Sequence, residues 1–131
     1  MEIVPFLSVG SLSFGDSRQV VRNKLASVYS VFVKDLGAGE TDSYDDLGLH
    51  LYYDAEGNLE FVEGFEPANI TFNGVGFIGA DLTSIVAQFR QQGFASFQSD
   101  VGVKFPGLGI ALTAPDGVVE GVAAHRKGYY D

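Results

Sequence analysis

The fold is decided by the stretch Leu49-His50-Leu51-Tyr52-Tyr53-Asp54-Ala55-Glu56-Gly57-Asn58-Leu59-Glu60-Phe61-Val62. Its first five residues alternate between side chains suited to a core and the more polar His50 and Tyr52, which is the two-residue period of a half-buried strand. Residues 55–58 are typical of a turn and residues 59–62 form a second run, so the stretch predicts a β-hairpin. A second hairpin is predicted from residues 109–114, a Pro115-Asp116-Gly117 turn and residues 118–125.

A short helix is predicted before each hairpin. In the first helix, Asp16 or Ser17 can cap free backbone N–H groups. Its apolar stripe consists of Val21, Leu25 and Val28. In the second helix, Asp81 can cap and the apolar stripe ends before Gly93. That stripe consists of Leu82, Ile85, Val86 and Phe89. Further strands are predicted at residues 28–34, 69–72 and 94–98, because β-branched and aromatic residues are frequent there.

The two halves of the chain show these features in the same order. Residues 14–25 align without gaps on residues 78–89, residues 47–53 on 108–114, and residues 56–60 on 116–120. The alignment predicts two internal repeats, at approximately residues 10–66 and 74–125. The length of 131 residues is that of a single domain. We therefore expect one α+β domain over residues 1–131, with a mainly antiparallel sheet and both helices on one of its faces.

Negative charge is concentrated in one part of the chain. The net charge is −9, and the ten acidic residues between Asp35 and Glu66 have no Lys or Arg among them. This balance disfavours nucleic-acid binding, because affinity for a phosphate backbone comes from clustered cations. The acidic block is either a solubilising surface or the source of a negative field that speeds encounter with a basic partner.

Composition excludes several classes of protein. The chain has no cysteine, which removes disulfides, thiol catalysis and cysteine-ligated metal centres. No run approaches the ~20 apolar residues that span a bilayer, so no membrane partner is expected. The first residues lack the basic start and apolar run of a secretion signal, and a cytoplasmic location is expected.

Gly74, Gly76 and Gly79 form a G-x-G-x-x-G pattern between a predicted strand and a predicted helix. In dinucleotide-binding folds this pattern lets the backbone approach a pyrophosphate. A small-molecule or nucleotide binder that uses this turn is therefore the alternative function. The flanking segments predict hairpins, however, and the chain has 17 glycines. A turn leading into the helix is the preferred interpretation, and no cofactor is expected.

No metal-binding or catalytic pattern stands out. Residues 54–60 place oxygen-bearing side chains at alternate positions, but the glycine and the final acid of a calcium loop are misplaced, which favours a hairpin turn. His50 and His125 are the only histidines and lack the short spacing of a metal-binding pair. There is also no G-x-S-x-G pattern. We expect no metal, no catalytic residue and no enzyme activity.

Tyrosines inside the acidic block indicate a binding surface. Tyr52 is expected on the strand face opposite Leu49 and Leu51. Tyrosine is frequent at interfaces because it buries a large area with little loss of side-chain freedom. Core packing or incidental exposure is the competing interpretation. The predicted surface, which should bind a basic protein, consists of Tyr44, Asp45, Asp46, His50, Tyr52 and Glu60.

One unit of the chain is a helix introduced by residues 14–17, which carries Val20, Val21 and Leu25, and a hairpin that follows through residues 47–49 and 57–60. This unit occurs twice. This arrangement resembles the repeat of beta-lactamase inhibitory protein and of the SmpA/OmlA-type lipoproteins, and the resemblance covers nearly the whole chain. The sequence has neither the inhibitor's cysteines nor the lipidated cysteine of the lipoproteins, and no secretion signal like the inhibitor's is expected. The resemblance implies an inhibitor or adaptor that presents a sheet face to another protein. Small acidic bacterial proteins that neutralise toxins are similar in size and charge, which suggests an immunity-type role.

Overall fold

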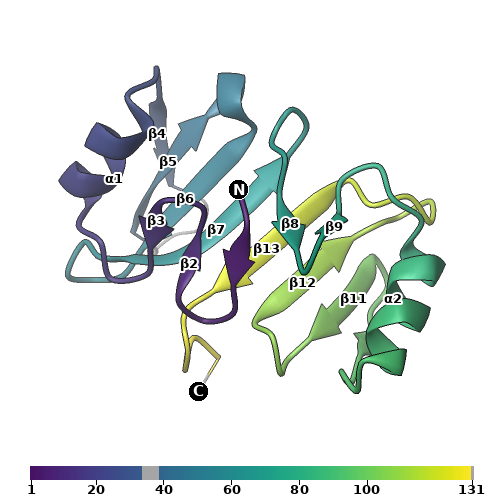
Figure 1. The fold of residues 1–131 in the computed structure, drawn as a ribbon. Helices are drawn as coiled ribbons and strands as arrows, with labels where there is room; N and C mark the ends of the chain where they lie inside the picture. The colour runs from purple at the N-terminus through teal and green to yellow at the C-terminus, as the bar shows by residue number, and fades with distance from the viewer. Residues whose placement is uncertain (34–38, 131) are drawn as a thin grey trace.

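The computed structural model describes residues 1–33 and 39–130. Eight strands of this part of the chain form the main sheet: β4 (Ser30–Val33), β5 (Glu40–Tyr44), β6 (Leu49–Tyr53), β7 (Leu59–Phe65), β10 (Phe97–Gln98), β11 (Gly102–Phe105), β12 (Ile110–Thr113) and β13 (Gly121–His125). Their spatial order is β10-β11-β12-β13-β7-β6-β5-β4 (Figure 1). All neighbours are antiparallel. The prediction of an α+β fold with a mainly antiparallel sheet is confirmed.

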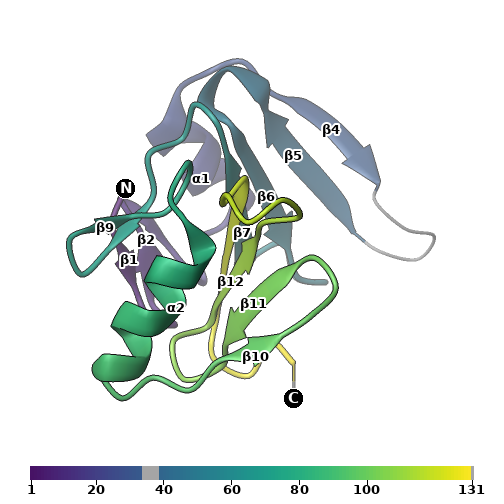
Figure 2. The ribbon, with the colours of Figure 1, turned by 90° about the vertical axis from the view of Figure 1, so that its right-hand side faces the viewer.

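Two helices and two small sheets cover one face of the main sheet. The covering elements are α1 (Arg18–Leu25), α2 (Leu82–Gln91), the β1-β2-β3 sheet (Ile3–Val4, Ser8–Val9 and Leu12–Ser13) and the β8-β9 hairpin (Thr71–Phe72 and Val75–Gly76). Figure 2 shows all of them on the same side of the main sheet. A 3-10 helix, η1 (Asp45–Leu47), connects β5 to β6. No helix of the described residues is long and apolar enough to cross a membrane.

Both helices begin at the predicted caps. The Ser17 hydroxyl accepts a hydrogen bond from the Val20 N–H, and the Asp81 carboxylate accepts one from the Ser84 N–H. The first helix ends earlier than predicted, because Ala26 adopts a left-handed conformation with φ of 47°. Val28 therefore lies beyond the helix, where its side chain is 79% exposed, and its assignment to the apolar stripe is wrong.

A single buried apolar cluster lies between the main sheet and the covering elements. The predicted inward residues Leu49, Leu51 and Tyr53 are buried in it. The helices contribute Val21, Ile85 and Phe89 to the same cluster. Since this cluster draws residues from both halves of the chain, the two halves share one core.

Equivalent backbone hydrogen bonds join each helix entry to its hairpin. The bonds are Gly15 N–H to Leu59 O and Arg18 N–H to Gly57 O in the first half, and Gly79 N–H to Val119 O and Leu82 N–H to Gly117 O in the second. These residues are at corresponding positions in the sequence alignment. Gly15 and Gly79 have φ of 99° and 87°, values that glycine adopts without steric cost.

The predicted hairpins are present as β6-β7 and β12-β13. The strands predicted at residues 28–34, 69–72 and 94–98 contain β4, β8 and β10, although Lys34 lies outside the described residues. The sequence reasoning missed the β1-β2-β3 sheet, β5, β9 and β11. Of these, β5 matters most for the site, since it lies beside β6 and leads directly into η1.

Candidate protein-binding face

The face of the main sheet opposite the helices is left uncovered by the described elements, and we call it the open face (Figure 2). Strand register identifies its residues. His50 lies opposite Glu63, Tyr52 lies opposite Phe61, and Phe61 also lies opposite His125 on the next strand. Tyr52 is thus on the opposite face from Leu49 and Leu51, as predicted, because successive strand residues point to opposite sides.

Half-buried aromatic side chains form two neighbouring groups of packed rings on the open face. We define this aromatic patch as Phe32, His50, Tyr52, Phe61, Phe65, His125 and Tyr129. The ring centroids of His50 lie 5.3 Å from Phe32 and 5.1 Å from Phe65. Phe61 lies 5.2 Å from Tyr52 and 5.1 Å from Tyr129. These distances are those of packed aromatic pairs, so the patch is preformed.

Glu63 connects the two parts of the aromatic patch. Its Oε1 accepts a hydrogen bond of 3.0 Å from the Tyr52 hydroxyl and lies 3.5 Å from Nδ1 of His50. Burial, the negative charge of Glu63 and this hydrogen bond together raise the pKa of Tyr52 well above its ordinary value. Tyr52 therefore stays a neutral phenol that holds the carboxylate among the rings.

The structure corrects the predicted position of Glu60. At a β-bulge Tyr53 pairs with Leu59 and Tyr52 with Phe61, so Glu60 is the extra residue of β7 and Glu63 lies opposite His50. Glu60 instead accepts a hydrogen bond of 3.3 Å from Nε of Arg126 and pairs with that guanidinium. Glu60 thus fixes the C-terminal segment and is not a free acid of the binding surface.

Tyr44 is fully buried, so its predicted place on the binding surface is wrong. It lies opposite Leu49 on the core side of the sheet, and its ring packs on Tyr29 at 5.4 Å. Its hydroxyl is buried without a hydrogen-bond partner among the described residues. Burial, and then the charge of Asp42, raise the pKa of Tyr44.

Asp45 and Asp46 are exposed at one end of the open face. The Ser43 hydroxyl donates to Oδ1 of Asp45 at 2.6 Å, which fixes this carboxylate. The two acids line a hollow of about 180 Å³ together with Val28, Tyr29, Ser30 and Ser43. Two carboxylates beside an exposed valine offer a place for a cation on an aliphatic stem, as in Lys or Arg.

Ion pairs neutralise more of the acidic block than the sequence indicates. Three of its acids, Glu40, Asp42 and Glu60, form ion pairs with arginines outside the block. Those arginines are Arg18, Arg22 and Arg126. Asp35 lies outside the described residues. The described acids of the block that no arginine pairs are Asp45, Asp46, Asp54, Glu56, Glu63 and Glu66. Of these, Glu63 lies within the aromatic patch, and Asp45 and Asp46 line the hollow.

The glycine pattern does not form a phosphate-binding turn. Gly74 belongs to the tight turn between the antiparallel strands β8 and β9, and Gly76 lies within β9. The Gly79 N–H donates to the Val119 carbonyl. At the start of α2, the Asp81 carboxylate occupies the position that a bound phosphate would need. This geometry gives no support to the nucleotide-binding alternative.

The two histidines are brought to the same face of the sheet but not to one site. Both have positions in the aromatic patch, where His50 contacts Phe65 and His125 packs against Phe61. Within residues 1–33 and 39–130, no group of three or more His, Asp or Glu side chains could hold a metal ion. Their shared environment is aromatic, which suits binding of a macromolecule better than metal coordination.

No known protein family, curated protein or solved structure matches this chain.

The sequence reasoning missed the phenylalanines Phe32, Phe61 and Phe65 and the acid Glu63. A signal for the last three was present, because Phe61, Glu63 and Phe65 alternate with Val62 and Gly64. With Val62 inward, the alternation places Phe61, Glu63 and Phe65 outward, whereas with Leu59 inward it places Glu60 outward. The bulge reconciles the two readings.

Proposed function

We propose that this chain is a non-enzymatic protein-binding module whose open face binds a basic partner protein. The observation that carries the proposal is the aromatic patch on a sheet face that the helices leave uncovered. Contiguous apolar surface on a folded protein marks an interaction site, whereas scattered single aromatics do not. An inhibitor, an adaptor and an immunity-type protein all fit this mode of action.

The aromatic patch would form the centre of the interface. Its rings already pack on one another, so they lose little conformational entropy when a partner covers them. Tyr52 and Phe61 are the principal anchors, since they lie on the two central strands β6 and β7. The exposed Asp45 and Asp46 would steer a basic partner and receive one of its Lys or Arg side chains in their hollow.

We also propose that the chain consists of two helix-plus-hairpin repeats, as in the family it resembles. Three features support this: the sequence alignment, the equivalent hydrogen bonds at Gly15 and Gly79, and a sheet order that reads outward in the same way from β7 and from β13. Two repeats joined through their last strands create one wide face from two narrow ones. An eight-stranded face is wide enough for an interface of standard size, about 800 Å² per partner.

The test compares two variants in capture from a lysate of the source cells. Tyr52→Ala combined with Phe61→Ala removes two anchors of the aromatic patch. The matched control is Val20→Ala, which truncates an exposed apolar side chain on α1, on the other side of the molecule. We expect the control to retain the proteins captured by the wild type and the patch variant to lose at least one of them. Equal recovery by all three would remove the aromatic patch as the binding site.

A further inference from the structure

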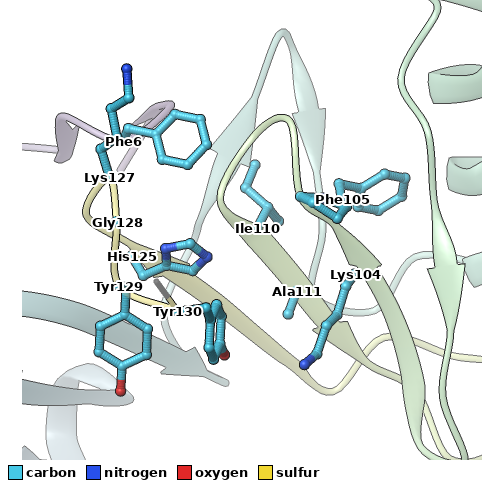
Figure 3. A pocket seen from close by; sticks show the side chains of 11 residues that line it. Phe6, Lys104, Phe105, Ile110, Ala111, His125, Lys127, Gly128, Tyr129 and Tyr130 are labelled. Atoms are coloured by element: carbon cyan, nitrogen blue, oxygen red, sulfur yellow. The ribbon is translucent and has the colours of Figure 1, made fainter.

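A pocket of about 330 Å³ opens at the corner of the open face where β11, β12 and β13 meet the first residues of the chain (Figure 3). Its apolar lining includes Phe6, Ile110 and Ala111. The ring of Tyr130 stands across from Lys104, and the His125 ring lies between Tyr130 and Ile110. This volume is at the small end of the range for ligand pockets, about 300–1,000 Å³.

Positive charge gathers at this pocket although the protein is acidic. Lys104 and Lys127 line it, and neither forms an ion pair within the described residues. Nζ of Lys104 lies 5.0 Å from the centroid of the ring of Tyr130, which also lines the pocket. A carboxylate bound there would meet an ammonium group already held by a ring face.

His125 presents one ring nitrogen to the pocket. Its Nδ1 lies 2.8 Å from the Arg126 carbonyl oxygen, which can only accept, so Nδ1 carries the proton. Nε2 is then left for a ligand and, on a neutral ring, accepts a hydrogen bond. The rings of Phe6 and Tyr130 both pack edge-on against His125, with centroids at 6.0 and 5.0 Å. The flat aromatic walls favour a planar ligand. The ammonium group of Lys104 favours a negative charge on that ligand, and Nε2 of His125 favours a hydrogen-bond donor.

We infer that this pocket binds a small planar aromatic carboxylate. The ring lies among Phe6, Ile110 and His125, and the carboxylate pairs with Lys104. A ring N–H or hydroxyl on the ligand donates to Nε2 of His125. The pocket shares His125 and Tyr129 with the aromatic patch but not Tyr52 or Asp45 and Asp46, and its binding is measured without any partner protein, so its test is independent of the function proposed above.

Indole-3-acetate is a suitable probe, because the protein has no tryptophan and the indole fluorescence is therefore the ligand's alone. Its fluorescence anisotropy is followed as wild-type protein is added. Lys104→Gln removes the cation, and Arg90→Gln is the matched control, since it removes the same charge from the exposed end of α2. Ala111→Ile fills the pocket with a side chain that suits a strand. Tryptamine is the probe with inverted charge.

We expect saturable binding by the wild type, about tenfold weaker binding by Lys104→Gln, which is ~1.4 kcal/mol, and unchanged binding by Arg90→Gln. Ala111→Ile should abolish binding, and tryptamine should not bind. Amide NMR spectra of each variant check that it is folded. Equal affinity of the two glutamine variants, tight binding of tryptamine, or full binding by a folded Ala111→Ile would each overturn the assignment, as would no saturation by the wild type.

Discussion

The Asp42 carboxylate and the Arg22 guanidinium form two hydrogen bonds between β5 and α1, of 2.9 Å from Nε and 2.8 Å from Nη2. The Asp42 side chain is fully buried, and the Arg22 side chain is 23% exposed. The Tyr53 hydroxyl donates to the same carboxylate at 3.2 Å. Arg22 also stacks over the Tyr29 ring at 4.4 Å. This pair holds the first helix on a strand that has little apolar surface of its own.

Asp42→Asn should destabilise the protein by about 3 kcal/mol, because it leaves the Arg22 charge in a partly buried place without its anion. Asp46→Asn is the matched control: it makes the same chemical change at an exposed site and should alter the free energy of unfolding by less than about 0.5 kcal/mol. Urea denaturation followed by circular dichroism measures both. Similar losses for the two variants would contradict the role of the buried pair.

Tyr44→Phe should stabilise the protein by about 1 kcal/mol. The variant keeps the ring that packs on Tyr29 and removes a buried hydroxyl that has no partner among the described residues. Its midpoint in urea should rise while the dependence on urea concentration stays the same. A lower midpoint would mean that the hydroxyl has a hydrogen-bond partner.

Asp16→Asn should destabilise the protein at neutral pH and not in acid. Burial by itself raises the pKa of Asp16, but the hydrogen bonds from Lys24 and Ser13 and the charge of Lys24 together lower it. A lowered pKa in the folded state contributes stability above the ordinary value of about 4, and this contribution is lost as pH falls through the folded value. We expect a difference of about 1 kcal/mol at pH 7 that narrows as pH falls below about 4 and through the folded value. A constant difference across this range would show that charge is not its cause.

Glu63→Gln should lower the pKa of Tyr52, because two of the causes that raise it come from Glu63. The pKa should remain above the ordinary value, since burial is the largest cause and persists. A raised tyrosine pKa means that stability is fully present below about pH 10 and is lost as pH rises toward the folded value. The variant should therefore lose less stability in alkali. An NMR titration that follows a ring carbon of Tyr52 measures this pKa. An unchanged pKa would mean that the Glu63 carboxylate does not lie beside the Tyr52 hydroxyl.

Salt should separate the two contributions to partner binding. Asp45→Asn with Asp46→Asn should slow association, and salt at ~0.5 M should slow association of the wild type, because screening shortens the reach of the field. Tyr52→Ala should mainly speed dissociation, at a cost of about 2 kcal/mol for an anchor at the interface centre. Surface plasmon resonance with the captured partner gives both rates. An association rate that does not change with salt would mean that the acidic block serves solubility and not partner binding.

Local patterns were enough to predict the hairpins and the helix starts. The alternation in Leu49–Tyr53 and the caps at Ser17 and Asp81 act within a few residues, so their structural consequence can be read from the sequence. The strand Glu40–Tyr44 could not be predicted in this way. Its Glu-Thr-Asp-Ser-Tyr composition is typical of a loop, and it becomes a buried strand because Arg22, from another element, neutralises Asp42.

The candidate site was predicted only in part. His50 and Tyr52 lie on the expected face because β6 alternates without interruption. Tyr44 and Glu60 were misplaced for different reasons. Tyr44 belongs to the strand that was missed, and Glu60 is next to a bulge whose position depends on pairing between strands. A register shift of one residue changes which side chains lie opposite one another, and no local pattern marks where that shift occurs.

The β7-β13 ladder in the middle of the main sheet has a consequence for how the molecule is made. Every other ladder of that sheet joins strands consecutive in the chain, whereas this one pairs residues 61–65 with residues 121–125. Pairing these strands closes a long loop, so it is entropically costly and forms slowly compared with local hairpins. We therefore expect the two halves of the sheet to form before this central ladder does. Because Phe61 and His125 pair across that ladder, we expect the aromatic patch to be complete only after the ladder has formed.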